Sequence, residues 1–310
     1  VLCGSFTRDR HLLTGHPLYR RFRHKTTVYT CDDHYSPLAP GVYASPRRGL
    51  STALGRVQSH AFASSYGLRA NAAVLAAAGE ADPGATVPKS LLCSFEGSST
   101  SRLRRRLFAL EVDPDEACIR DTSTSYRHFD PRASDQPASD QAGGQAGYVA
   151  TMLSSRFVLC PRGVGTGTLR LFEAMSLGVA PVLISDRYVL PPGPAWDTFL
   201  VRIPERRAGD VVAILRPLAS QSAPRARLAR AAWEEWFAPD VIFDRLMDAA
   251  ASAHAAGESV FGLYALLGPP LALGLAARTR ARPMAATMVA RGRQAAPVAR
   301  RPRTPPGRPR

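Results

Sequence analysis

A glycine-rich turn with two flanking arginines and one glutamate is the stretch of this chain whose residue types best suit chemistry. Residues 160–175 read CPRGVGTGTLRLFEAM and lie between the apolar runs SSRFVL and GVAPVLISD. Glycines let a ligand approach the backbone closely, and a helix that begins just after them directs free N–H groups at that ligand. The stretch therefore predicts a phosphate-binding turn between a strand and a helix.

The charged side chains refine this prediction. Arg162 and Arg170 can form charge-assisted hydrogen bonds with phosphate oxygens, whereas Glu173, three residues beyond Arg170, would repel phosphate. Because a carboxylate suits the paired hydroxyls of a ribose, we expect a nucleotide or a nucleotide sugar, with its diphosphate at the turn. The predicted donor-binding residues are Arg162, Gly163, Gly165, Thr166, Gly167, Thr168, Arg170 and Glu173.

Two other phosphate-binding motifs fit the turn less well. A P-loop ends in Gly-Lys-Ser/Thr, and this turn has no lysine. The dinucleotide fingerprint G-x-G-x-x-G fits Gly163 and Gly165, but Thr168 stands in place of its third glycine. Asp186 ends the next strand, where a ribose-binding acid would lie. A nicotinamide-dinucleotide-binding oxidoreductase therefore stays an alternative.

Apolar runs and helical spacing indicate the elements that position the turn. We expect strands over 26–31, 90–94, 156–160 and 179–185, and helices over 51–79, 100–111, 147–155, 168–177, 208–219 and 224–250. The polar residues 121–147 predict a flexible connection. Strands that are apolar throughout and alternate with helices are typical of a parallel α/β fold.

The helix expected over residues 100–111 has a clear amphipathic pattern. Leu103, Leu107 and Leu110 share one face, which we expect to be buried, and Thr100 or Ser101 is a suitable N-cap. Residues 104–106 are three consecutive arginines, which we interpret as a solvated face.

The block YVATMLSSRFVLCPRGVGTGTLRLFEAMSLGVAPVLISDRYVLPPGPAWDTFLVRIPE (148–205) closely resembles the exostosin-like glycosyltransferases, glycosyltransferase family 47. The matching elements are the strand and turn S-[KR]-F-x-L-C-P-R-G, the helix R-L-F-E-A-M, the strand G-x-x-P-V-x-I-S-D, and then Trp196 and Glu205. Residues 91–107 and 27–45 agree more loosely. The resemblance implies a GT-B fold, in which two Rossmann-like domains face a cleft, and sugar transfer with inversion from a nucleotide sugar to a saccharide acceptor.

The resemblance also suggests how the chain divides. We expect a short, partial acceptor-side domain over residues 1–85 and a nucleotide-sugar-binding domain over 86–255. An apolar segment over 256–277 and a disordered Arg/Pro-rich tail over 278–310 follow. Because the first domain is shorter than the family's, a non-catalytic exostosin-like remnant that acts as a binding module is a second alternative.

Inversion needs a base that takes the proton of the acceptor hydroxyl. Asp32 and Asp33, with His34, follow the strand expected over 26–31 and are the candidate base, and Glu96 is a second candidate. Residues 113–115 spell Asp-Pro-Asp, a pattern that other glycosyltransferases use for a metal, but here it follows a helix and indicates a turn. We therefore expect no metal and no cofactor besides the nucleotide-sugar substrate.

The charge and cysteine content bear on partners and setting. The 310 residues carry a net charge of +15, and removing the ten arginines of residues 278–310 leaves +5, so we expect no nucleic-acid partner. Five cysteines without metal-like spacing predict reduced thiols and a cytoplasmic setting. Residues 260–277 carry no charge and are followed by Arg278, Arg280 and Arg282, so we expect a peripheral membrane contact through residues 260–282.

Overall fold

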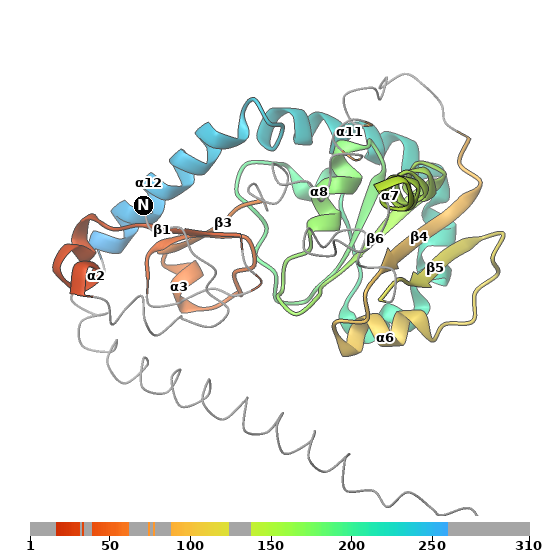
Figure 1. The fold of residues 1–310 in the computed structure, drawn as a ribbon, viewed down its shortest axis with the longest axis horizontal. Helices are drawn as coiled ribbons and strands as arrows, with labels where there is room; N and C mark the ends of the chain where they lie inside the picture. The colour runs from red at the N-terminus through yellow and green to blue at the C-terminus, as the bar shows by residue number, and fades with distance from the viewer. Residues whose placement is uncertain are drawn as a thin grey trace, which may run out of the picture. The chain divides into compact units, whose positions relative to one another are not determined.

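Two parallel β-sheets and their helices make up the fold (Figure 1). The computed structural model describes residues 17–31, 33, 39–61, 74, 77, 88–123 and 138–259, all of which belong to the unit Val1–Phe261. Asp32, His34, the membrane segment expected over 260–282 and the tail lie outside the described residues. Within the described part of the chain, none of the helices has both the length and the apolar character that a membrane crossing requires.

The larger sheet has five parallel strands in the order β5-β4-β6-β7-β8. The strands are β4 (Leu91–Gly97), β5 (Ala117–Asp121), β6 (Ser155–Pro161), β7 (Ala180–Ile184) and β8 (Val201–Arg202). The chain runs outward from β4 to β5 and then returns to place β6 on the other side of β4. This order is the 2-1-3-4-5 arrangement of doubly wound sheets, which confirms the predicted parallel α/β layers.

Helices cover both faces of the larger sheet because successive strand residues point to opposite sides. On one face, α7 (Ala138–Leu153), α8 (Leu169–Ser176) and α11 (Ser222–Trp236) pack with Val158 and Leu183. On the other face, α6 (Arg102–Phe108) and α10 (Val211–Leu215) pack with Phe157 and Val182. The central strands are therefore buried on both sides, as their uninterrupted apolar sequences require.

The smaller sheet has three parallel strands in the order β1-β2-β3. They are β1 (Val28–Thr30), β2 (Gly41–Tyr43) and β3 (Val57–Ser59), with α2 (Pro17–Phe22), η1 (Arg23–Lys25) and α3 (Leu50–Ala53) around them. Gly41 allows β1 and β2 to approach closely, because a Cβ at this position would lie 2.2 Å from the carbonyl oxygen of Val28. Tyr19, Val28, Ala39, Tyr43 and Val57 form the core of this sheet.

The remaining elements are α9 (Trp196–Phe199), η3 (Glu205–Asp210), η4 (Arg216–Gln221) and α12 (Ile242–Ser259). Of these, α9 lies between β7 and β8 in the chain, and the others follow β8. The last turn of α12 meets the smaller sheet, where Arg56 Nη1 donates to the carbonyl of Gly257 at 2.7 Å and Thr27 Oγ1 lies 3.4 Å from His254 Nδ1. The domain boundaries expected from the sequence stay a prediction.

Several local expectations are wrong. The helix expected over 51–79 is interrupted after α3, because Gly55 has φ 72° and Val57–Ser59 pair with β2 as strand β3. Of its second half, only Val74 and Ala77 are described, and both are helical. The helix expected over 224–250 is two helices, α11 and α12, with Pro239 in the break between them. The connection expected over 121–147 contains the first ten residues of α7, and strands β2 and β5 were not anticipated at all.

Candidate functional site

The candidate site lies where the strand order of the larger sheet reverses, between β4 and β6. Ligands of doubly wound sheets bind beyond the carboxyl ends of the strands at this point. Here β4 ends with Glu96 and Gly97, and β6 ends with Pro161, followed by Arg162 and the turn 163–168. Helix α8 begins directly after this turn, with Thr168 as its N-cap, so its partly positive end faces the same edge of the sheet.

Arg104 of α6 joins the two strand ends across the switch point. Its guanidinium donates at 3.2 Å to each of three backbone carbonyls, those of Ser98, Pro161 and Arg162. The guanidinium carbon also lies 5.4 Å from the centre of the Phe95 ring. The expectation of a solvated side chain is therefore wrong for Arg104, because turns at strand ends leave carbonyls that need donors.

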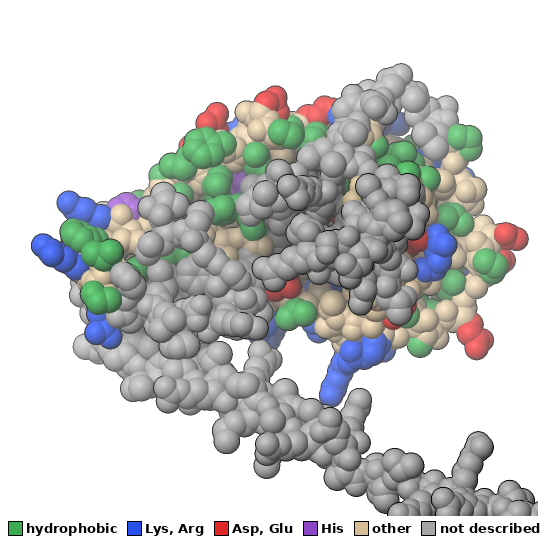
Figure 2. All heavy atoms as spheres, in the orientation of Figure 1, with side chains coloured by type: hydrophobic (Ala, Val, Ile, Leu, Met, Phe, Trp, Pro, Cys, Tyr) green, Lys and Arg blue, Asp and Glu red, His purple; other side chains and the backbone are tan. Residues whose placement is uncertain are grey.

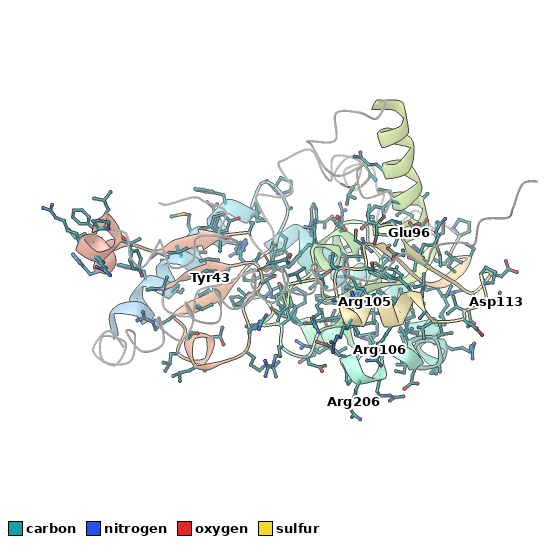
Figure 3. The ribbon with its side chains drawn as sticks, turned by 60° about the horizontal axis from the view of Figure 1, so that its bottom comes forward. Tyr43, Glu96, Arg105, Arg106, Asp113 and Arg206 are labelled. Atoms are coloured by element: carbon teal, nitrogen blue, oxygen red, sulfur yellow. The ribbon has the colours of Figure 1, made fainter. Side chains whose placement is uncertain are left out.

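The other two arginines of this run are exposed, as expected (Figure 3). Arg105 donates to the carbonyl of Ser99, and Arg106 donates to the carbonyls of Glu205 and Arg206. Ser101 is the N-cap of α6, and its hydroxyl accepts the N–H of Arg104 at 3.2 Å. This confirms one of the two N-cap candidates from the sequence.

Arg170 is held in the first turn of α8 between two aromatic rings. Its guanidinium carbon lies 4.9 Å from the ring centres of both Phe95 and Tyr148. Its Nε donates to the Tyr148 hydroxyl at 2.9 Å, and its Nη1 donates to the carbonyl of Glu96. The structure thus places a largely buried positive charge at the carboxyl end of β4, stabilised by both rings.

Glu173 lies beneath Arg170 and is 3% exposed. Its Oε2 accepts the Tyr148 hydroxyl at 2.5 Å and lies 3.9 Å from Arg170 Nε. Burial raises the pKa of the Glu173 carboxyl, and the positive charge of Arg170 and the hydrogen bond from Tyr148 oppose that rise. Burial also raises the pKa of Tyr148 well above its usual value. The carboxylate therefore acts on the site through Tyr148 and Arg170.

Arg162 forms an ion pair that crosses the ends of three strands. Its Nε donates to Glu205 Oε1 at 2.8 Å, and this carboxylate also accepts the N–H of Asp186 at 3.3 Å. Asp186 Oδ1 in turn accepts the N–H of Glu205 at 3.0 Å. The hydrogen bond with Glu205 raises the pKa of Arg162. Burial by itself would raise the pKa of Glu205, but the hydrogen bond from Arg162, together with the other nearby donors and charges, outweighs burial, so this pKa is lowered.

The glycine turn is fixed by the segment that follows β2 of the smaller sheet. The Gly167 N–H donates to Ser45 Oγ at 3.2 Å, and the Thr166 hydroxyl lies 3.1 Å and 2.9 Å from the carbonyl oxygens of Ser45 and Pro46. Ser185 Oγ donates to the carbonyl of Thr166 at 2.8 Å. These contacts hold the second half of the turn against the segment that follows β2.

Asp33 lies directly against Gly165 of the turn. A Cβ built on Gly165 would lie 2.5 Å from the carbonyl oxygen of Asp33 and 2.8 Å from its Oδ1. It would also lie 2.8 Å from Ser45 Oγ. Glycine is therefore required here, because its missing side chain is what lets the candidate base from the end of β1 contact the predicted donor turn.

The structure separates Glu96, the second candidate base, from this contact. Glu96 contributes its backbone carbonyl to Arg170, while its carboxylate pairs at 2.6 Å with Arg120 of β5. Sequence reasoning missed Tyr148, Arg104 and Ser45, whose roles depend on contacts between distant segments. Tyr148 opens the block that closely resembles the glycosyltransferases, and Ser45 and Arg104 lie in the two stretches that agree more loosely.

Asp113 and Asp115 lie in the turn between α6 and β5, as the sequence indicates. Asp113 Oδ1 accepts the N–H of Asp115 at 2.9 Å, and the Asp113 carbonyl accepts the N–H of Glu116 at 3.0 Å. Among the residues that the structure describes, no three His, Cys, Asp or Glu side chains are grouped in a way that could hold a metal ion. The absence of a metal stays a prediction.

The fold and the site together define an α/β protein with a doubly wound parallel sheet and an anion-suited turn at its switch point. Residues 75–218 match the exostosin GT47 domain. This match agrees with the resemblance of residues 148–205 to the exostosin-like glycosyltransferases. This match does not favour the nicotinamide-dependent oxidoreductase.

Three curated relatives have similarity to parts of the chain. A probable glycosyltransferase of Arabidopsis thaliana is 37% identical over 70 residues, which are 22% of this chain and 15% of that protein. Human exostosin-2 is 31% identical over 93 residues, 29% of this chain and 13% of that protein. A probable glucuronoxylan glucuronosyltransferase of A. thaliana is 35% identical over 77 residues, 24% and 17% respectively. The chain thus matches less than a fifth of the length of each relative.

Proposed function

We propose that this chain is an inverting glycosyltransferase that moves a sugar from a nucleotide-sugar donor to a saccharide acceptor. The observation that carries the proposal is the contact between Asp33, at the carboxyl end of β1, and Gly165, in the turn after β6. It brings a carboxylate from the smaller sheet to the predicted phosphate turn of the larger one. The GT-B arrangement, with a cleft between two domains, is part of this proposal.

Arg162, Gly163, Gly165, Thr168 and Arg170 would hold the donor at the switch point. The arginines and the N-terminus of α8 supply positive charge for the diphosphate. Thr166 and Gly167 would contribute by fixing the turn through Ser45, and Glu173 would orient Arg170 through Tyr148. Glu173 would reach a ribose directly only if its hydrogen bond with Tyr148 broke.

The reaction requires one bond to form and one to break at the anomeric carbon of the donor sugar. The acceptor hydroxyl oxygen attacks that carbon while Asp33 takes the hydroxyl proton, so inversion follows from attack on the face opposite the leaving group. The bond from the anomeric carbon to the diphosphate breaks, and the departing negative charge is stabilised by Arg162, Arg170 and the N-terminus of α8.

A substitution at Asp33 separates donor binding from transfer. Asp33→Asn removes the base but keeps the size of the side chain, so we expect thermal stabilisation by the cognate nucleoside diphosphate to persist. Removal of general base catalysis should lower transfer by about 10²–10⁴-fold. Asp248→Asn is the matched control, because Asp248 is an exposed carboxylate on α12.

The wild-type chain is first screened for thermal stabilisation by nucleoside diphosphates and for transfer to saccharides by product NMR. If the protein is folded and none of the nucleoside diphosphates raises its melting temperature, the proposed donor site is wrong. Binding without transfer would instead support the binding-module alternative. Full transfer by Asp33→Asn would rule out Asp33 as the base.

A further inference from the structure

Helix α2 presents two large apolar side chains to solvent. Leu18 is 56% exposed and Phe22 is 42% exposed. They lie four residues apart, so they occupy the same face of the helix, one turn above the other. Scattered single apolar residues on a surface need no explanation, but an adjacent pair on one short helix is a local apolar patch.

The fold holds this patch in place. Tyr19, about 60–100° around the helix axis from the apolar pair, is 7% exposed and packs in the core of the smaller sheet with Val28 and Tyr43. The helix end is also fixed, because the hydroxyl of Thr26 donates to the carbonyl of Phe22 at 2.8 Å. The outward direction of Leu18 and Phe22 is therefore set by the burial of Tyr19.

Positive charge surrounds the apolar pair. Residues 17–25 read PLYRRFRHK and contain four arginine or lysine residues and no acidic residue. Arg20, Arg21 and Lys25 are exposed, and the guanidinium carbon of Arg21 lies 5.3 Å from the centre of the Phe22 ring. Figure 2 shows hydrophobic side chains with Lys and Arg side chains on either side of them, where Figure 1 places α2.

We propose that α2 and η1 dock the protein on a lipid surface rich in anionic headgroups. The guanidinium and ammonium groups match the lipid phosphates and carboxylates, and Leu18 and Phe22 enter the boundary between headgroups and acyl chains. A soluble acidic polymer would bind only the positively charged side chains and would leave Leu18 and Phe22 exposed to water. The combination of both features on one rigid helix therefore favours a lipid surface as the occupant.

This surface shares no residue with the candidate site or with the stretch expected to contact a membrane over 260–282. It packs on the smaller sheet, whereas the turn 163–168 follows β6 of the larger sheet. Docking here would hold the protein at a membrane whether or not the proposed sugar transfer is correct.

Vesicle binding by the full chain tests the proposal. We expect the protein to sediment with vesicles of phosphatidylcholine and phosphatidylserine, and much more weakly with vesicles of phosphatidylcholine alone. Leu18→Ser/Phe22→Ser removes the apolar pair and should weaken binding by about tenfold or more, since part of each side chain no longer leaves water. Leu228→Ser/Phe243→Ser is the matched control, because both side chains are exposed on other helices, and its binding should be unchanged.

The charge is tested in the same assay. Arg20→Gln/Arg21→Gln should weaken binding to the anionic vesicles by about tenfold or more. Arg156→Gln/Arg227→Gln removes the same charge from exposed positions elsewhere and should leave binding within about twofold of the wild type. Added salt should weaken vesicle binding by the wild type more steeply than binding by Arg20→Gln/Arg21→Gln, because the variant has fewer charges for salt to screen.

A fluorescence variant gives a direct readout of insertion. When anionic vesicles are added, the extra tryptophan fluorescence of Phe22→Trp relative to the wild type should shift to shorter wavelength. Brominated lipid should quench it. Equal binding to both vesicle types would overturn the proposal, as would equal loss in the α2 and control variants. Binding to soluble polyglutamate as strong as to vesicles, and unchanged by Leu18→Ser/Phe22→Ser, would show an acidic polymer surface instead.

Discussion

Removal of one hydroxyl group should test the buried network at the switch point. Tyr148→Phe deletes the donor to Glu173 Oε2, at 2.5 Å, and the acceptor for Arg170 Nε, at 2.9 Å. Both partners are charged and largely buried, and each hydrogen bond to a charged group contributes about 1.5–3 kcal/mol. We therefore expect the free energy of unfolding at neutral pH to fall by about 3 kcal/mol or more.

Urea denaturation followed by circular dichroism measures this change. Because burial already raises the pKa of Glu173, loss of the Tyr148 hydroxyl should raise it further. When the pKa of a carboxyl group is higher in the folded than in the unfolded state, the free energy of unfolding falls as pH rises through that pKa. The loss in free energy of unfolding that Tyr148→Phe causes should therefore be largest at neutral pH and become smaller at acidic pH.

Tyr43→Phe is the matched control. Tyr43 is fully buried in the smaller sheet, and its hydroxyl donates at 3.1 Å to the neutral carbonyl of Ala39, so its removal should cost only about 1 kcal/mol (Figure 3). If Tyr148→Phe costs no more than Tyr43→Phe, the two charges do not depend on the hydroxyl. The role assigned to Glu173 in orienting Arg170 would then be wrong.

Two further substitutions test the turn and a buried histidine. Gly165→Ala should unfold or displace the turn and abolish transfer, because its Cβ would lie 2.5 Å from the Asp33 carbonyl oxygen. Gly147→Ala meets nothing within 4 Å in a helix and should stabilise the protein by ~0.5–1 kcal/mol, so equal melting temperatures would contradict this reasoning. Burial lowers the pKa of His60 from 6.5 to about 4, so the folded state resists protonation and loses up to ~3 kcal/mol as pH falls from 6.5 to 4. His60→Gln should flatten that part of the stability curve, whereas the same change at the exposed His24 should not.

Much of the larger sheet could be predicted because its signals are local. The strand before the glycine turn, helix α8 and the strand after it lie within one or two residues of their expected positions. Strand β5 and the first turns of α7 were missed, because ACIRD is half polar and residues 138–147 are rich in glycine and polar side chains. In both cases tertiary packing overrides weak local preference.

The sequence alone predicted a phosphate-binding turn and carries the match of residues 75–218 to the exostosin GT47 domain, because both depend on residue order. It placed Arg162, Arg170 and Glu173 near one another, since a strand, a short turn and a helix fix their spacing. Only the tertiary structure decided what each contacts: Arg162 pairs with Glu205, Arg170 with Tyr148 and a β4 carbonyl, and Asp33 with Gly165. Those partners lie 20 to more than 130 residues apart in the chain, so the choice among them depends on which segments the buried cores bring together.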